Sequence, residues 1–181
     1  MNEEESLHQA IRERVRIVPY DPAWPEKYEE ERERLVTLAP SAFVAIEHVG
    51  STAVTGMAAK PIIDIAVGVR SMADADELLI TLCANGYSTS AVFNATLIDQ
   101  RWLMRHAGGH RTHHLHLVIH EDREWRRKIA FRNALRADAK AAIRYHVLKT
   151  RLALDKGSDR DAYTSAKTEF VEEVLRCHGV S

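Results

Sequence analysis

The chain has 181 residues, of which 45% are hydrophobic and 28% are charged, the composition of an ordinary globular domain. Lysine and arginine number 25 and aspartate and glutamate number 26, so the formal net charge is -1 and no overall positive field favours nucleic acid as a partner. No run approaches the roughly 18 apolar residues that a membrane span needs, and the acidic first residues do not form a signal peptide. We therefore expect a cytoplasmic protein, a monomer or homodimer, with no membrane as partner.

The two cysteines, Cys83 and Cys177, lie far apart in helical patterns and lack the spacing of a metal site. Thiols in such positions usually contribute to packing. We expect both to be free and buried, in a protein of a reducing compartment.

The apolar pattern predicts the elements in chain order. Residues 1–14 form a polar lead-in with helical character. Helices follow at 26–38 and 72–85, with a short helix or turn at 53–59. Strands are expected at 43–49, 61–69, 87–93, 101–106 and 113–120. The Gly108-Gly109 pair marks the turn between the last two strands.

The pattern changes at residue 122, beyond which the strand signals end. Helices are predicted at 122–136, 138–156 and 159–178. Strands interleaved with helices, followed by helices alone, predict an α+β fold with a small mixed sheet and flanking helices. We therefore expect a lead-in over 1–14, an α/β core over 15–121 and a helical C-terminal segment over 122–181 packed on that core.

The first candidate for chemistry is the turn Gly50-Ser51-Thr52, which follows the strand predicted at 43–49. Glycine lets the backbone approach a ligand closely, and hydroxyls at the start of a helix add donors, so such a turn suits phosphate. The alternative interpretation is that these residues only cap the following helix, which is the commoner use of the pattern.

The second candidate is Asp64, which stands in the middle of the apolar run 61–69. A carboxylate is costly to bury without a partner, so it should be paired, bind a metal or line a cleft. The alternative is a structural ion pair or a carboxylate that accepts backbone hydrogen bonds.

The third candidate is the histidine-rich segment 112–120. On a strand, His114, His116 and His120 lie on one face and the intervening apolar residues on the other. Imidazoles two residues apart can bind a metal, contact phosphate or move protons. The alternative is the solvated polar face of an edge strand.

The fourth candidate is a set of basic and aromatic side chains in the helical segment. Tyr145 and Lys149 are four residues apart, as are Tyr163 and Lys167, so each pair shares a helix face. Such faces suit a triphosphate or a base. The alternative is a solvated charged surface over packed aromatic stems.

These stretches together resemble the GrpB family of nucleotidyltransferase-like proteins. They run in order from about residue 15 to 175, and the segment from His48 to Asp64, with its long fixed spacing, is the most specific. The matching stretches are 18–25, 46–54, 59–65, 111–116, 131–136 and 163–167.

The resemblance implies a nucleotidyltransferase fold of the DNA polymerase β kind. In that superfamily a Gly-Ser turn holds the phosphates of a nucleotide, and aspartates on the following strand and on a later one hold divalent metal. Gly50, Ser51 and Asp64 match this pattern, so Asp64 is the expected catalytic residue. The expected phosphate-binding residues are Gly50, Ser51, Thr52, Lys60, Arg111, Lys149 and Lys167.

The sequence departs from the superfamily pattern at the metal ligands. The second carboxylate falls on Ala66, which cannot bind metal, and His114 and His116 are best placed to stand for the third. The expected metal ligands are therefore Asp64, His114 and His116. Magnesium prefers oxygen ligands and imidazole favours zinc-like metals, so the expected cofactor is Mg²⁺, Mn²⁺ or a Zn²⁺-like ion.

The function that the resemblance implies is transfer of a nucleoside monophosphate from a nucleoside triphosphate to a hydroxyl of a small molecule or protein. Metal ions would stabilise the charge that moves from the attacking to the leaving oxygen. Two alternatives stay open. One is a degenerate nucleotide- or metal-binding module, which Ala66 favours, and the other is a metal-dependent hydrolase built on the histidines and Asp64.

Overall fold

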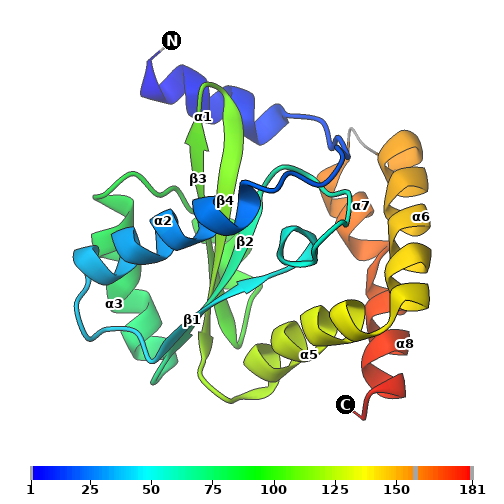
Figure 1. The fold of residues 1–181 in the computed structure, drawn as a ribbon. Coiled ribbons are helices and arrows are strands. Elements are labelled where there is room, and N and C mark those ends of the chain that lie inside the picture. The colour runs from blue at the N-terminus through cyan, green and yellow to red at the C-terminus, as the bar shows by residue number, and fades with distance from the viewer. Residues whose placement is uncertain (1, 157–158, 180–181) are drawn as a thin grey trace.

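The computed structural model describes residues 2–156 and 159–179, which form a mixed sheet flanked by helices (Figure 1). The strands are β1 (Ala45–Val49), β2 (Ile63–Val69), β3 (Gln100–Ala107) and β4 (His110–Ile119). They lie in the order β1-β2-β4-β3, with β2 and β4 parallel and the two outer pairs antiparallel. This confirms the predicted α+β fold. The predicted outer bounds at Met1 and Ser181 lie outside the described residues.

The helices precede, connect and follow the strands. Their bounds are α1 (Glu3–Arg12), α2 (Trp24–Leu38), α3 (Met72–Cys83), α4 (Ala91–Ala95), α5 (Arg123–Ala137), α6 (Ala139–Lys156), α7 (Arg160–Ser165) and α8 (Thr168–Cys177). A 3₁₀ turn, η1 (Ser51–Ala53), follows β1. Within the described part of the chain, no helix is both long and apolar enough to cross a membrane.

The two faces of the sheet differ because side chains alternate along each strand. Ile65, Leu103 and Leu115 have no exposed surface and pack beneath α2 and α3. Burying each such side chain contributes roughly 1.5–3 kcal/mol, so this face forms the main core. The opposite face carries Asp64 and His114, which are register partners on β2 and β4.

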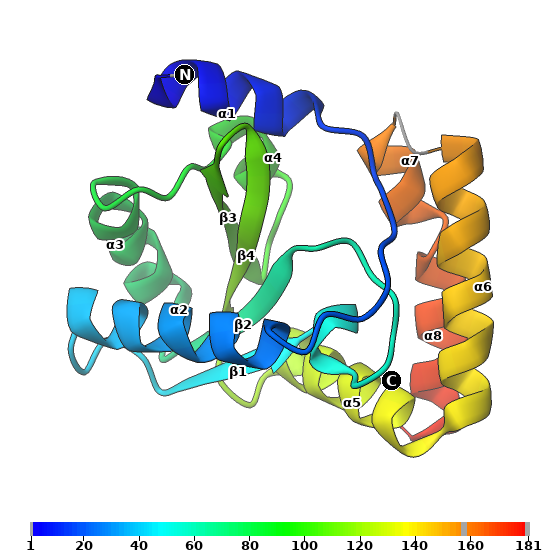
Figure 2. The same cartoon turned by 45° about the horizontal axis from the view of Figure 1, so that its top comes forward.

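The C-terminal helices cover the polar face of the sheet from one side. Figures 1 and 2 show α5 leading from the end of β4 to α6 and α8, which lie side by side with α7 at one end. A second apolar cluster joins these helices to the loop after η1, with Met57 from the loop, Phe131 from α5, Tyr145 from α6 and Phe170 from α8. The helical segment is therefore packed on the α/β core.

The polar lead-in is a complete helix. Asn2 and Glu5 form a capping box at the start of α1. The hydroxyl of Ser6 accepts a hydrogen bond from the backbone of Gly109, and Ala10 has no exposed surface. Helix α1 thus packs over the turn between β3 and β4 (Figure 2).

The strand predicted at 87–93 is wrong. Only Ser88 forms an isolated bridge, to Met104, and the short helix α4 begins at Ala91. The hydroxyl of Ser90 accepts a hydrogen bond from the backbone of Phe93 and caps this helix. The cap and the buried Asn94, whose side chain binds the backbone of Trp102, outweigh the apolar composition of the segment.

The helix predicted at 159–178 is two helices, α7 and α8, separated at residues 166–167. The break lets α7 and α8 pack in different apolar clusters. Tyr163 packs with Val15 and Leu152, whereas Phe170 packs with Phe131 and Tyr145.

The cysteine prediction is half right. Cys83 and Cys177 are free, but both are exposed. In α3 the buried positions Ala75, Leu78 and Leu82 form one stripe, and a residue next to Leu82 is rotated by about 100° away from it. A cysteine within a helical pattern therefore need not lie on the buried face.

Candidate functional site

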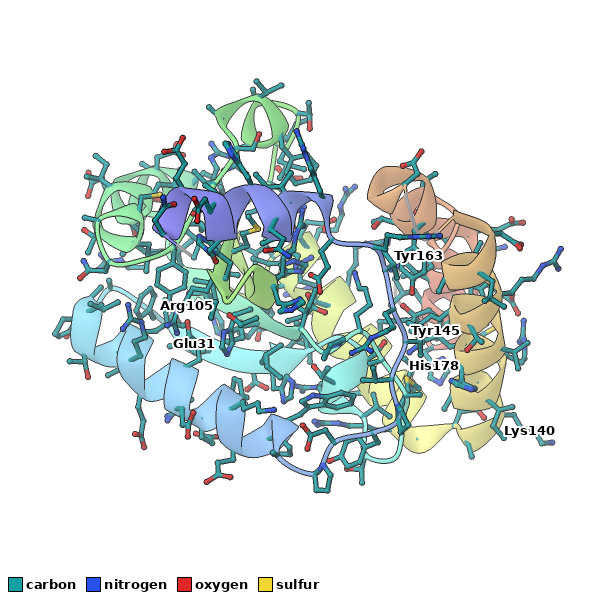
Figure 3. The ribbon with its side chains drawn as sticks, turned by 90° about the horizontal axis from the view of Figure 1, so that it is seen from above. Glu31, Arg105, Lys140, Tyr145, Tyr163 and His178 are labelled. Carbon is teal, nitrogen blue, oxygen red and sulfur yellow. The ribbon has the colours of Figure 1, made fainter. Side chains whose placement is uncertain are left out.

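A cavity of about 720 Å³ lies between the polar face of the sheet and the C-terminal helices. Figure 3 shows Tyr145 and Tyr163 on the inner side of these helices, facing the sheet. The cavity brings together all the residues predicted to bind phosphate or metal: Gly50, Ser51, Thr52, Lys60, Asp64, Arg111, His114, His116, Lys149 and Lys167.

The floor of the cavity is a cluster of one carboxylate and two imidazoles. Oδ1 of Asp64 lies 3.1 Å from Nδ1 of His114 and 3.8 Å from Nε2 of His116. Parallel pairing of β2 and β4 sets the first contact, because Asp64 and His114 are register partners. The Asp64 side chain is 27% exposed, so the cluster opens to the cavity.

Gly50 lies directly against this carboxylate. Its φ is 71°, a left-handed conformation that favours glycine. A Cβ atom at this position would lie 2.7 Å from Oδ2 of Asp64, closer than real contacts allow. Glycine is therefore needed for both its conformation and its lack of a side chain.

At neutral pH the cluster carries one negative charge. Burial alone would raise the pKa of Asp64, but hydrogen bonds from His114 and His116 and their charges outweigh it and hold this pKa well below its ordinary value. Burial lowers the pKa of His114 to about 4. Burial, followed by the charge of Lys128, lowers the pKa of His116. The carboxylate is thus ionised between two neutral imidazoles.

The opposite wall carries ammonium groups. Lys149, on α6, is only 3% exposed, and its Nζ donates to Oγ of Ser51 at 2.9 Å and to the carbonyl of Ala58 at 2.8 Å. Nζ of Lys167 lies 4.4 Å from the ring centre of Tyr163, and Nζ of Lys60 lies 5.4 Å from the same ring. Cations from separate parts of the chain therefore converge on one wall.

Desolvation and mutual repulsion lower the pKa values of Lys149 and Lys167. Burial, followed by the positive charge of Lys60, lowers the pKa of Lys149 to about 7, while Asp64 acts in the opposite direction. The same causes, in the same order, lower the pKa of Lys167 to about 7. Near neutral pH each group is close to the point at which it gains or loses a proton.

The metal site predicted at Asp64, His114 and His116 stays a prediction. The described residues contain no group of three or more His, Cys, Asp or Glu side chains placed to hold a metal ion. Nδ1 of His114 and Nε2 of His116 both face Oδ1 of Asp64, at 3.1 and 3.8 Å. The second nitrogens, Nε2 of His114 and Nδ1 of His116, are buried without a hydrogen-bond partner among the described residues.

Thr52 and Arg111 have structural contacts besides their place in the cavity wall. Oγ1 of Thr52 is buried against Nε2 of His48 at 3.0 Å, which fixes the turn after β1. The guanidinium of Arg111 donates to the carbonyls of Ala10 and Ile11 and lies over the ring of Trp102. Both residues are therefore held in place by the protein itself.

The candidate His120 and two arginines of α5 lie outside the cavity lining. Arg132 donates to Glu47 and to the carbonyl of His48, and Arg136 donates to the carbonyl of Ala53, so both brace the backbone around the Gly-Ser turn. His120 packs against an aromatic ring of α5.

Sequence reasoning missed several residues that line the cavity, among them Phe93, Gln100, Trp102 and Lys128. Gln100 and Trp102 alternate on β3 as the histidines do on β4, and this alternation was a usable signal. Lys128 gives no such signal, because its position depends on how α5 crosses the sheet.

Comparison with known proteins agrees with this arrangement. The family model described as GrpB protein matches residues 14–176 of the chain. The chain belongs to the GrpB family. The crystal structure of conserved protein GrpB from Enterococcus faecalis is similar to it at 33% identity and a TM-score of 0.78, covering 90% of this chain and 99% of that one.

Relatives of this GrpB protein differ in length. The glutamate-rich protein GrpB of Alkalihalophilus pseudofirmus is 31% identical, over 89% of this chain and 94% of the relative. The UPF0157 protein YqkA of Bacillus subtilis is 34% identical over 92% of this chain, which spans only 48% of that relative. A dephospho-CoA kinase of Mycolicibacterium paratuberculosis is 31% identical over 94% of this chain and 47% of its own length. The chain thus spans about half the length of two of these relatives.

Proposed function

We propose that this GrpB protein binds the polyphosphate group of a ligand, such as a nucleoside triphosphate, in the cavity beneath the C-terminal helices. The observation that carries the proposal is the convergence of Lys60, Lys149 and Lys167 on one wall. These residues come from the loop before β2, from α6 and from the junction of α7 and α8. A fold that gathers cations from three segments is suited to an anion that bridges them.

The protonation of the lysines supports the same ligand class. Their pKa values near 7 mean that crowding and burial oppose a full positive charge on Lys149 and Lys167. A multivalent anion would relieve the repulsion and restore the ordinary pKa. The pocket would thereby gain binding energy from charges that are costly in the empty protein.

Tyr163 supplies a donor at the same wall. Its side chain is 1% exposed, and its hydroxyl has no hydrogen-bond partner among the described residues. Burial, followed by the charge of Asp64, raises its pKa to about 12, so the hydroxyl keeps its proton at neutral pH. A buried unpaired hydroxyl costs free energy, and a phosphate oxygen would satisfy it.

Transfer of a nucleoside monophosphate, the reaction that family resemblance implies, is the second candidate. It is favoured by the position of Asp64 against Gly50 and beside Ser51. The reaction would need groups that stabilise the charge on the transferring phosphate. Lys60, Lys149 and Lys167, which line the same cavity, would supply positive charge for that task. A hydrolase that depends on metal bound to the histidines has no comparable support.

Calorimetric titration with tripolyphosphate and with ATP, without added metal, tests the proposal. Both ligands should bind the wild type, and Lys149→Met should weaken binding by about 1.5–3 kcal/mol, the range for hydrogen bonds to charged groups. Lys140→Met is the matched control, because Lys140 is an exposed lysine on the same helix (Figure 3). Absence of binding to the wild type, or equal losses in both variants, would refute the proposal.

Incubation with α-labelled nucleoside triphosphates and cell extract separates the two candidates. Label transferred to an acceptor by the wild type and lost in Asp64→Asn would establish transfer. Tight binding without transfer would leave the protein as a binding module.

A further inference from the structure

The end of the cavity formed by β3 and α4 is aromatic. Trp102 on β3 packs edge-to-face with Phe93 of α4, with ring centres 5.7 Å apart, and both rings line the cavity. Gln100 precedes Trp102 by two residues on the same strand, so both project from the sheet face that carries His114. The family comparison and the proposed function assign nothing to this group.

A continuous row of contacts connects the two ends. Nζ of Lys149 lies 2.9 Å from Oγ of Ser51, and the preceding residue, Gly50, lies against Asp64. Asp64 is 3.1 Å from His114, whose ring centre is 5.4 Å from that of Trp102. The floor of the cavity therefore runs from cations through one carboxylate to an aromatic platform.

This order decides how an elongated anionic ligand can lie. The ionised Asp64 repels phosphate, so the phosphates are confined to the lysine end. The portion that passes Asp64 reaches Trp102, over whose ring the guanidinium of Arg111 lies at 5.8 Å from the ring centre. Indole rings favour flat aromatic partners, which they contact by stacking or by edge-to-face packing.

Gln100 narrows the chemistry of that partner. Its Oε1 is buried and has no hydrogen-bond partner among the described residues. A buried amide oxygen without a donor costs free energy, and an N–H group of a ligand would remove that cost. Exocyclic amino groups of adenine, cytosine and guanine, and ring N–H groups of guanine, thymine and uracil, are donors of this kind, so each common nucleobase carries at least one.

We infer that Trp102, Phe93 and Gln100 form a nucleobase subsite, in which the amide oxygen of Gln100 accepts a hydrogen bond from an N–H group of the base. The cavity volume of about 720 Å³ lies within the range of small-molecule sites. The inference rests on the proposed function, because the lysines hold the phosphates of the same ligand. It makes the ligand a nucleoside polyphosphate rather than an inorganic polyphosphate.

Calorimetric titration of the protein with ATP and, separately, with tripolyphosphate tests the aromatic platform of Trp102 and Phe93. The wild type should bind ATP on the order of tenfold more tightly than tripolyphosphate, since stacking on one aromatic side chain has about that effect. Trp102→Leu should abolish the difference and leave tripolyphosphate binding unchanged, whereas Trp102→Phe should retain most of it. Phe93→Leu, at a 44% exposed position that tolerates substitution, should reduce the difference in part.

Recognition of the base by Gln100 is tested by two nucleotides that differ in the donor. ATP should bind more tightly than the triphosphate of purine riboside, whose base has no N–H group, and Gln100→Leu should remove that preference. If tripolyphosphate binds and ATP binds no more tightly, the subsite is refuted and the proposed function stands. If the wild type binds neither ligand, the proposed function fails and the subsite with it. Equal affinities for the two nucleotides would refute the role of Gln100.

Discussion

Replacing Lys149 with methionine should remove a pH dependence from the free energy of unfolding. Lys149 is 3% exposed, and burial, followed by the charge of Lys60, lowers its pKa from 10.5 to about 7. A lysine whose pKa is lower in the folded state destabilises the fold wherever the unfolded chain holds more protons. The buried lysine therefore lowers the free energy of unfolding by the full amount below pH 7, and this loss shrinks as the pH rises toward 10.5. For one such group, the free energy of unfolding rises by on the order of 2–3 kcal/mol between pH 6 and pH 9.

Urea unfolding of the wild type, Lys149→Met and the exposed control Lys140→Met at the two pH values measures this effect. Other groups with shifted pKa values, the buried histidines among them, titrate in all three proteins, so the comparison isolates the part of the pH dependence that requires Lys149. On going from pH 6 to pH 9, the free energy of unfolding of the wild type and of Lys140→Met should rise by about 2–3 kcal/mol more than that of Lys149→Met. The same gain in all three proteins would refute the burial and the charge crowding assigned to Lys149.

Three further predictions concern the same site. Gly50→Ala should destabilise the protein by more than 1 kcal/mol in urea unfolding, beyond the loss in Gly56→Ala, because both glycines have positive φ but only Gly50 would bring a Cβ against Asp64. Equal losses would show that the contact does not matter. Tripolyphosphate binding should weaken as the pH rises above 7, by up to about tenfold per pH unit for each lysine that must take up a proton, since Lys149 and Lys167 have pKa values near 7 in the empty protein. Calorimetry in buffers of different ionisation enthalpy would count the protons, and affinity independent of pH would contradict the assignment. Zn²⁺ without nucleotide should leave the thermal midpoint unchanged, because the described residues contain no group of three or more His, Cys, Asp or Glu side chains placed to hold a metal ion. A rise in the wild type that Asp64→Asn abolishes would show that Asp64 and the histidines hold one.

The position of the floor cluster could be predicted from the sequence. An aspartate inside an apolar strand and histidines alternating along a later strand both indicate one polar sheet face, and pairing of β2 with β4 places Asp64 beside His114. The orientation of the imidazoles could not be predicted, because it depends on local side-chain packing. That orientation points Nδ1 of His114 and Nε2 of His116 at Asp64 and leaves the other nitrogen of each ring buried without a partner among the described residues.

The aromatic end of the cavity could not be predicted from the sequence, because it depends on the order of the strands in the sheet. Trp102 and Gln100 alternate as regularly as the histidines, but they join the site only because β3 pairs with β4 at the edge of the sheet. Tyr87 to Phe93 has a composition typical of a strand, yet the Ser90 cap and the buried Asn94 make part of it a helix. The secondary-structure propensities of the residues cannot predict such tertiary hydrogen bonds.

The lysines of the C-terminal helices show a case in which the local pattern was predicted but the tertiary arrangement was not. The spacing of Tyr145 with Lys149 and of Tyr163 with Lys167 predicted shared helix faces, and both pairs form cation–π contacts. Whether those faces meet the core or solvent depends on the break between α7 and α8, which has no proline or glycine to mark it. The structure turns both faces into the cavity.

A crystal structure of the protein with tripolyphosphate tests the central claim most directly. The account predicts an anion in contact with Lys60, Lys149 and Lys167, with the hydroxyl of Tyr163 donating to one of its oxygens. An anion bound elsewhere, or a cavity that stays empty at a tripolyphosphate concentration that saturates the protein in solution, would contradict it.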